Sequence, residues 1–218
     1  MHLIAHRGCM TDYPENTLRA FHAIAERVDV IEFDVRRCGS GELVVFHDER
    51  LERVTAGGGY VAETSWSELK ELRIHGTTER IPLLSEVLAG LPNSMRLNIE
   101  LKSSGIAADV HTQCLETTHD VLISSFDDEE LRDAADAGFD SLAPLCYEGY
   151  DQALNFATDL DCCCIHPSVE LALSTDVITR AHDLGLETNV WTIKTSEQFE
   201  KMRTKDVDGV FVNTLTIA

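Results

Sequence analysis

The segment 30–36 carries the strongest constraint on how this chain can fold. It reads Val-Ile-Glu-Phe-Asp-Val-Arg, so apolar and charged side chains alternate from Ile31 onward. With the period of two that a β-strand imposes, the apolar side chains share one face, and Glu32, Asp34 and Arg36 share the other. A strand at a solvated surface would show the same alternation, so this segment alone leaves the fold open.

A second segment, 96–102, repeats the pattern as Arg-Leu-Asn-Ile-Glu-Leu-Lys and places Glu100 on its polar face. Strands of a parallel sheet are covered on both faces and are usually almost entirely apolar. These two strands carry charged side chains on one face and so depart from that pattern. A closed barrel with helices outside explains the departure, because the apolar faces meet the helices and the charges point into the barrel mouth. Converging carboxylates repel one another and lose hydration unless a cation lies among them. The two segments therefore predict a metal site formed by Glu32, Asp34 and Glu100.

Strand-like and helix-like patterns alternate along the rest of the chain. Strands are expected at 2–6, 30–36, 96–102, 121–126, 141–146, 162–166, 187–193 and 209–213, with a further apolar run at 43–47. Helices are expected at 15–27, 82–91, 107–117, 127–137, 150–158, 175–184 and 196–204. This series predicts a (β/α)8 TIM barrel in the α/β class. The sequence has no room for a full helix after the eighth strand, and an open doubly wound sheet is the alternative.

The helix and strand pattern loosens between residues 48 and 81. A run of three glycines, 57–59, predicts a loop, and the segment 64–69 has the sequence of a short capped helix. The whole stretch is too short to bury a core of its own. We therefore expect one domain over residues 1–218, with a small insertion at about 48–81 on the barrel rim.

Acidic residues outnumber basic ones by 38 to 18, which gives a net charge of -20. Such a surface repels nucleic acid and anionic membranes, so neither is expected as a partner. The chain has five lysines, and an acidic, lysine-poor surface is favoured in a high-salt cytoplasm, where salt screens its self-repulsion. We expect a halophilic protein, with an acidic enzyme of ordinary salt conditions as the alternative.

The N-terminal residues lack the pattern of a signal peptide, and no apolar run is long enough to cross a bilayer. The cysteine count is odd at seven, and three of the cysteines are consecutive at 162–164. Free thiols in a reducing compartment are therefore expected. These features predict a cytoplasmic protein without stable membrane insertion.

Polar and aromatic side chains gather where the expected strands end, which is the active-site end of a (β/α)8 barrel. They are His6, Arg7, Glu32, Asp34, His47, Glu100, Lys102, His166 and Trp191. The carboxylates are hard oxygen ligands, which suit Mg²⁺ or Ca²⁺ better than zinc. Two histidines beside such a cation can act as general acid and base. Arg7 and Lys102 add positive charge, which together with a cation predicts an anionic phosphoryl group in the substrate.

These residues also have structural interpretations. His47 with Asp48 can form a surface pair, and His166 and Trp191 can serve packing alone. Their coincidence at the strand ends favours an active site.

Short motifs along nearly the whole chain match, in order, those of one enzyme family. They are His6-Arg7-Gly8, Pro14-Glu15-Asn16-Thr17, Glu32-Phe33-Asp34-Val35, Val44-Val45-Phe46-His47-Asp48 with Leu51, Arg53, Thr55 and Gly57, Ile81-Pro82, Ile99-Glu100-Leu101-Lys102, Ser125-Phe126 and Trp191-Thr192. In this combination the chain resembles the glycerophosphodiester phosphodiesterase family. The resemblance implies a (β/α)8 barrel with a small insertion after the second-histidine motif, where the pattern loosens here.

The same resemblance assigns roles to the residues at the strand ends. It implies a divalent metal, Mg²⁺ or Ca²⁺, on Glu32, Asp34 and Glu100, and acid–base catalysis by His6 and His47. The implied reaction hydrolyses a glycerophosphodiester to glycerol phosphate and an alcohol. By this analogy, the nucleophile can be the substrate's own 2-hydroxyl group, giving a cyclic phosphate that water then opens.

The resemblance also implies phosphate contacts from Arg7 and Lys102 and a substrate contact from Trp191. The chain departs from the family pattern at two positions. Asn213 stands where an aspartate is common after the last strand, and Lys194 stands where an asparagine is common after the Trp-Thr pair. Neither belongs to the metal or histidine motifs, so the departures bear on the expected substrate range more than on the expected activity.

The expected partner is a small-molecule phosphodiester, and a subunit contact in place of the eighth helix would make the protein a homo-oligomer. A related enzyme acting on lysophospholipid or another headgroup is the main alternative. A binding protein on a decayed enzyme fold is less favoured, because the metal and histidine motifs are intact. A sugar-processing barrel is also less favoured, because of the paired histidines and the cationic residues. The sequence leaves open the leaving alcohol, the choice of metal and which histidine is the acid.

Overall fold

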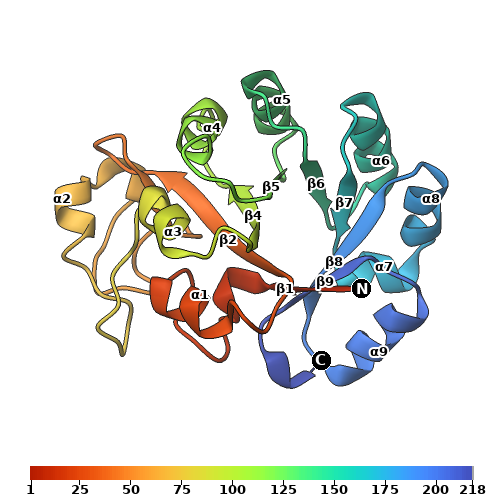
Figure 1. The fold of residues 1–218 in the computed structure, drawn as a ribbon, viewed down its shortest axis with the longest axis horizontal. Coiled ribbons are helices and arrows are strands. Elements are labelled where there is room, and N and C mark those ends of the chain that lie inside the picture. Colours follow the sequence, from red (N-terminus) through yellow and green to blue (C-terminus); the bar gives the residue numbers. More distant parts are fainter. Residues whose placement is uncertain (218) are drawn as a thin grey trace.

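The structure, a computed structural model, describes residues 1–217, and its centre is a barrel of eight parallel strands (Figure 1). The barrel strands are β1 (His2–Ala5), β2 (Val30–Arg37), β4 (Arg96–Leu101), β5 (Val121–Ser125), β6 (Leu142–Cys146), β7 (Cys164–Pro167), β8 (Glu187–Ile193) and β9 (Gly209–Val212). Neighbouring strands pair in parallel, and β1 pairs with both β9 and β2, so the barrel is closed. The predicted (β/α)8 barrel is confirmed, and the open doubly wound sheet is excluded.

Helices surround the barrel and connect consecutive strands (Figure 1). They are α1 (Leu18–Ile24), α3 (Leu84–Gly90), α4 (Ala107–Cys114), α5 (Asp128–Ala137), α6 (Tyr150–Asp159), α7 (Val169–Ser174), α8 (Val177–Asp183) and α9 (Ser196–Thr204). Helix α1 begins later than expected, because the Thr17 hydroxyl accepts the backbone N–H of Ala20 and caps the first turn. The sequence pattern does not predict α7, whose six residues are too few to show a helical period. After β9, the described chain contains only the 3₁₀ turn Leu215–Ile217.

The apolar face of β2 packs outward against the helices, as its alternation predicts. Phe33 is fully buried, and its ring centroid lies 5.6 Å from that of Phe21 on α1. Ile31 and Val35 belong to the same buried cluster. Burying a side chain of this size contributes about 1.5–3 kcal/mol. Because these side chains occupy the outer face of β2, its acidic side chains point into the barrel.

The segment 48–81 packs as a small layer against one side of the barrel, next to β3 (Leu43–Val45) (Figure 1). Strand β3 pairs antiparallel with β2 outside the barrel, and the expected short helix is α2 (Trp66–Leu69). A second apolar cluster holds this layer together, formed by Cys38, Val44, Phe46, Leu51, Val61, Leu69, Ile74 and Ile81. The Phe46 backbone N–H donates to the Asp34 carbonyl at 3.0 Å. This bond joins the layer to the end of β2 where the carboxylates lie.

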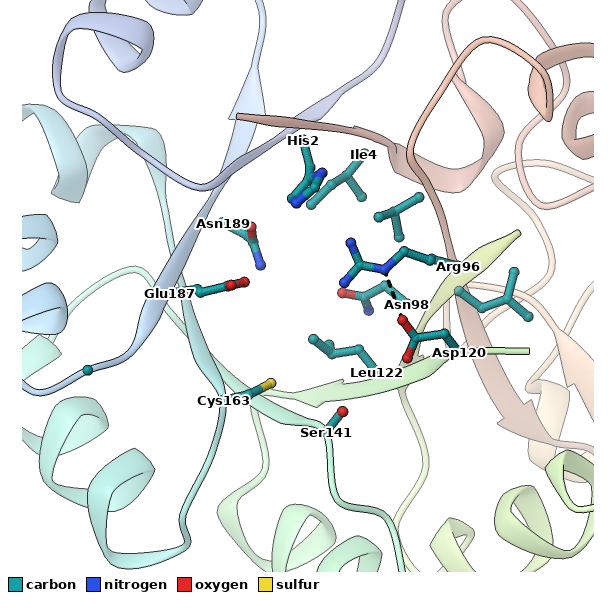
Figure 2. A pocket seen from close by; sticks show the side chains of 13 residues that line it. His2, Ile4, Arg96, Asn98, Asp120, Leu122, Ser141, Cys163, Glu187 and Asn189 are labelled. Atoms are coloured by element: carbon teal, nitrogen blue, oxygen red, sulfur yellow. Dashed lines mark hydrogen bonds and ion pairs between the residues drawn. The ribbon is translucent and has the colours of Figure 1, made fainter. Parts of the chain in front are cut away.

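The N-terminal ends of the strands surround a polar cavity of about 390 Å³ at the other end of the barrel (Figure 2). His2, Arg96 and Glu187, which begin β1, β4 and β8, line it together with Cys163. Arg96 is paired there with Asp120 at 3.0 Å. In (β/α)8 enzymes this end of the barrel serves stability, and catalysis takes place at the opposite end.

Two further findings concern the cysteines and the helices. All seven cysteines are free thiols. Among residues 1–217, no helix is long and apolar enough to span a bilayer.

Candidate active site

Strand register brings the three predicted metal-ligating carboxylates together. Strands β2 and β4 pair with Glu32 beside Asn98 and Asp34 beside Glu100, so the polar faces of both strands line the barrel interior. One carboxylate oxygen from each of Glu32, Asp34 and Glu100 lies within 4.8 Å of the other two. None of the three residues is more than 6% exposed. The alternating pattern in the sequence thus becomes a buried acidic cluster near the C-terminal ends of two neighbouring strands.

Burial at this spacing shifts the pKa values of the three carboxyl groups apart. Burial raises the pKa of Glu32 well above its ordinary value, and the charges of Asp34 and Glu100 raise it further. Burial also raises the pKa of Glu100 to about 7, although Lys102 opposes the shift. Burial would raise the pKa of Asp34 as well, but Arg7 and Lys102 outweigh it and lower that pKa. Without a further cation, the cluster therefore retains protons at neutral pH.

In two of these carboxylates, one oxygen accepts a hydrogen bond from the protein and the other accepts none from the described part of the chain. Glu32 Oε2 accepts the backbone N–H of Arg7 at 2.8 Å, and Asp34 Oδ2 accepts the side-chain N–H of Asn16 at 2.9 Å. Glu32 Oε1 and Asp34 Oδ1 are buried and have no hydrogen-bond partner among residues 1–217. An unpaired buried carboxylate oxygen is costly, and hard oxygen donors grouped in this way suit Mg²⁺ or Ca²⁺. The residues present therefore fit a divalent cation.

Arg7 and Lys102 lie against the cluster and pair with its carboxylates. Arg7 Nε is 3.2 Å from Asp34 Oδ2, and Arg7 Nη1 is 3.2 Å from Glu15 Oε1. Lys102 Nζ donates to Glu100 and lies 3.6 Å from Asp34 Oδ1. Burial would lower the pKa of both cations, but the carboxylates outweigh it and raise both values. Both predicted phosphate-binding residues are thus charged and stand beside the acidic cluster.

His6 and His47 line the same cavity from two different segments. His6 follows β1 in the 3₁₀ turn His6–Gly8, and its Nδ1 lies 2.6 Å from Asn213 Oδ1. His47 follows β3, and its Nδ1 lies 2.6 Å from Asp48 Oδ1. Burial lowers the pKa of His6 to about 4 and also lowers the pKa of His47. Both imidazoles are therefore neutral at neutral pH.

A cavity of about 180 Å³ joins the histidines, the cations and two of the carboxylates. It is lined by His6, Arg7, Glu32, His47, Glu100, Lys102, Phe126, Leu145, Trp191, Thr192 and Phe211. Trp191 Nε1–H donates to the His166 carbonyl at 2.7 Å, and its ring stands edge-on to Phe126 with centroids 5.5 Å apart. The predicted catalytic, metal-binding and substrate-binding residues thus meet in this cavity or, for Asp34, in the adjoining carboxylate cluster.

The imidazole of His166 points elsewhere. Its Nε2 lies 3.5 Å from Cys164 Sγ and 3.2 Å from Asn189 Nδ2, and the residue is fully buried. These contacts support the packing interpretation of His166 over a role in the site.

A network of ion pairs behind His47 is not identifiable from the sequence alone. Asp48 accepts from Arg53 Nε at 2.5 Å, and Arg53 Nη1 is 2.7 Å from Glu15 Oε2. Glu15 in turn pairs with Arg7. Asp48, Arg53 and Glu15 do belong to the matched motifs, but the pairing of Arg53 with Glu15 spans 38 residues and depends on the fold.

Comparison with known proteins agrees with this geometry. The sequence profile of the Glycerophosphoryl diester phosphodiesterase family matches residues 6–216. A glycerophosphodiester phosphodiesterase of Bacillus altitudinis is 33% identical over 97% of this chain and 94% of its own length. One of Caldanaerobacter subterraneus is 31% identical over 97% and 93%. The structure of an Oleispira antarctica phosphodiesterase in complex with the product sn-glycerol-3-phosphate matches with a TM-score of 0.86 and 27% identity, covering 98% of this chain and 93% of that one. The chain belongs to the glycerophosphoryl diester phosphodiesterase family.

Proposed function

We propose that this glycerophosphodiester phosphodiesterase uses a divalent cation held by Glu32, Asp34 and Glu100 and acid–base catalysis by His6 and His47. One observation carries the proposal: two imidazoles line the same cavity as two members, Glu32 and Glu100, of a cluster of three buried carboxylates. The reaction hydrolyses a glycerophosphodiester to glycerol phosphate and an alcohol.

The cation, Mg²⁺ or Ca²⁺, would be held by Glu32 Oε1 and Asp34 Oδ1, which have no hydrogen-bond partner among residues 1–217, together with Glu100. When bound, it supplies positive charge that polarises the phosphoryl group. Ligands must be deprotonated to bind metal. Because the pKa values of Glu32 and Glu100 are raised, we expect metal affinity to increase with pH through neutrality.

Arg7 and Lys102 are placed to bind the phosphate, since both line the cavity and both are charged. A planar guanidinium can contact two phosphate oxygens at once, whereas an ammonium group acts as a point charge. Trp191 and Phe126 form an apolar wall on the same cavity. This wall would pack against the substrate and exclude water from one side of it.

His6 and His47 would share the proton transfers. One imidazole takes the proton of the attacking hydroxyl, from water or from the substrate's 2-hydroxyl group, at its Nε2. The other protonates the leaving alcohol oxygen, so it must gain a proton on Nε2 when the substrate binds, which the negative charge of the phosphate favours. In both residues Nδ1 already faces a protein oxygen at 2.6 Å. Nε2 is therefore the ring nitrogen that serves the substrate in each case.

We also infer that residues 1–218 act as one cytoplasmic domain with the insertion at about 48–81. The apolar cluster that the insertion shares with β3 supports a single domain. The free thiols support a reducing compartment such as the cytoplasm. The net charge of -20 supports adaptation to high salt.

A lysophospholipid is the second candidate substrate, and the apolar rim of the cavity favours it. Phe126 is 45% exposed, Tyr147 is 61% exposed, and their ring centroids lie 6.0 Å apart next to the polar site. Exposed apolar patches beside a polar cavity are typical of ligand-binding grooves. An acyl chain could lie across these rings.

The test measures glycerol phosphate release from glycerophosphocholine and lysophosphatidic acid release from lysophosphatidylcholine. Each assay is run after EDTA treatment and after addition of Mg²⁺ or Ca²⁺, with His47→Ala and Glu32→Ala. The matched controls are His75→Ala and Glu148→Ala, because both residues are exposed on the surface.

We expect turnover of glycerophosphocholine that EDTA abolishes and added cation restores. General acid–base catalysis contributes about 10²–10⁴-fold, so His47→Ala should lower kcat by that factor while both control variants keep full activity. Faster turnover of lysophosphatidylcholine than of glycerophosphocholine would identify lysophospholipid as the preferred substrate class. Full activity in EDTA, or in His47→Ala, would overturn the mechanism.

A further inference from the structure

The register between the first and last barrel strands places Asn213 beside His6. Ala5 at the end of β1 is the partner of Val212 at the end of β9, so the next residue of each strand, His6 and Asn213, are neighbours. Their side chains meet through Nδ1 and Oδ1 at 2.6 Å, across 207 residues of sequence. The Asn213 carbonyl also accepts the backbone N–H of Thr11 at 2.9 Å. Asn213 is thus held both by its strand and by the loop that follows His6.

The segment after Asn213 is fastened to the same loop. Asp12 Oδ1 accepts the Thr214 hydroxyl at 2.9 Å, and Asp12 Oδ2 accepts the Leu215 backbone N–H at 3.1 Å. Three hydrogen bonds therefore tie residues 213–215 to Thr11 and Asp12. These bonds fix the chain around Asn213, and the side-chain Oδ1 of Asn213 faces Nδ1 of the imidazole ring.

The contact has a chemical consequence for His6. A side-chain amide oxygen accepts hydrogen bonds and cannot donate them, so a neutral imidazole in contact with it must carry its hydrogen on Nδ1. Nε2 then has a lone pair and no hydrogen. No side chain or backbone group among residues 1–217 forms a hydrogen bond with His6 Nε2, and the ring lines the catalytic cavity.

We propose that Asn213 is a positioning residue that holds His6 in the tautomer with hydrogen on Nδ1 and presents Nε2 to the substrate as a proton acceptor. The proposal rests on the acid–base role proposed above for His6. The neutral amide provides an orienting acceptor without adding a sixth carboxyl group to a site that already holds those of Glu15, Glu32, Asp34, Asp48 and Glu100.

Two substitutions separate positioning from packing. Asn213→Leu keeps approximately the same volume and removes the acceptor, whereas Asn213→Asp keeps an acceptor oxygen. Asn155→Leu on α6 is the matched control, because Asn155 is exposed and distant in the chain from both strands. Each protein is labelled with ¹⁵N at histidine, and the His6 ring resonances, assigned by their loss in His6→Gln, report which nitrogen carries the hydrogen.

We expect hydrogen on Nδ1 of His6 in the wild type and in Asn213→Asp, and loss of that preference in Asn213→Leu. Correct tautomer placement is part of the 10²–10⁴-fold contribution of a general base, so kcat should fall about 10²-fold in Asn213→Leu with KM changed less than about 3-fold. Asn213→Asp should keep kcat within about 10-fold, and Asn155→Leu should match the wild type.

Hydrogen on Nε2 of His6 in the wild type would overturn the proposal, and this spectrum needs no variant to fold. A fall in kcat in Asn213→Leu with an unchanged tautomer would also overturn it, since the residue would then act through packing. Full activity in His6→Gln would instead refute the catalytic role of His6. The ¹⁵N spectrum of the wild type would still show whether Asn213 sets the tautomer of His6. The failure of one proposal is thereby distinguished from the failure of the other.

Discussion

Replacing Glu100 with glutamine should stabilise the metal-free enzyme at pH 7.5 and remove its stabilisation by a divalent cation. Glu100 is 6% exposed, and its burial raises its pKa to about 7. Glutamate in an unfolded chain ionises near pH 4.3, at about its unperturbed pKa. Between these two pH values the folded protein binds more protons than the unfolded chain, so the free energy of unfolding falls as pH rises and levels off above the folded pKa.

The magnitude follows from the difference between the two pKa values. One pKa unit corresponds to about 1.4 kcal/mol, so the ionised carboxylate costs the folded state about 3 kcal/mol above pH 7, relative to pH 4. Glutamine has a similar shape and no charge, and Lys102 keeps Asp34 as an ion-pair partner at 3.6 Å. We therefore expect Glu100→Gln to gain about 1–3 kcal/mol over the metal-free wild type at pH 7.5.

The assay is urea unfolding of EDTA-treated wild type and variant at pH 5 and pH 7.5, with Glu148→Gln as a surface control. The advantage of Glu100→Gln should grow with pH. Thermal unfolding with added cation completes the test: at 100 times Kd a ligand stabilises by about 2.7 kcal/mol, or roughly 5–10 °C for a chain of this length, and only the wild type and the control should respond. A variant less stable than the metal-free wild type at pH 7.5, or one that still gains the full shift, would refute the reasoning.

Three further predictions concern other parts of the molecule. Glu130 accepts the backbone N–H groups of Ile106 and Ala107 at 2.9 and 2.8 Å. Replacing it in Glu130→Ala should therefore lower the free energy of unfolding in urea by about 2–4 kcal/mol. A loss as small as that of Glu129→Ala, the control at an exposed residue, would contradict this. The contact between the Cys163 and Cys164 thiols, 3.8 Å apart, lowers the pKa of Cys163 to about 7. Alkylation of this exposed thiol should therefore reach half its maximal rate near pH 7. A midpoint near 8.5, the value of an unperturbed thiol, would be the opposing result. The net charge of -20 predicts lower stability on dilution from molar salt into low salt; an unchanged unfolding midpoint would count against salt adaptation.

The sequence predicts the barrel and its catalytic end because both depend on short periodic patterns. In β2 and β4, alternation alone separates the outer apolar face from Glu32, Asp34 and Glu100, and parallel pairing without a register shift then brings these groups together. The rule that strand C-terminal ends form the active site adds the histidines and the cations. This part of the site needs no knowledge of distant contacts.

The remaining features depend on contacts between segments that lie far apart in the chain. The partner of His6 is Asn213, and only the β1–β9 register shows that the two meet. The Arg53–Glu15 pair depends in the same way on how the insertion packs against the barrel. Phe126, Leu145 and Phe211 line the candidate active-site cavity although their apolar side chains resemble those of any core. Helix α7 is too short for its pattern to be distinguished from a loop.

The most direct test of the account is a crystal structure grown with Mn²⁺ and sn-glycerol 3-phosphate, with anomalous diffraction used to locate the metal. The account predicts one anomalous peak among the carboxylates of Glu32, Asp34 and Glu100, and a phosphate within hydrogen-bond distance of Arg7 or Lys102. A cation bound elsewhere, with these carboxylates still protonated or paired only with Arg7 and Lys102, would contradict the central claim that the acidic cluster is the catalytic metal site.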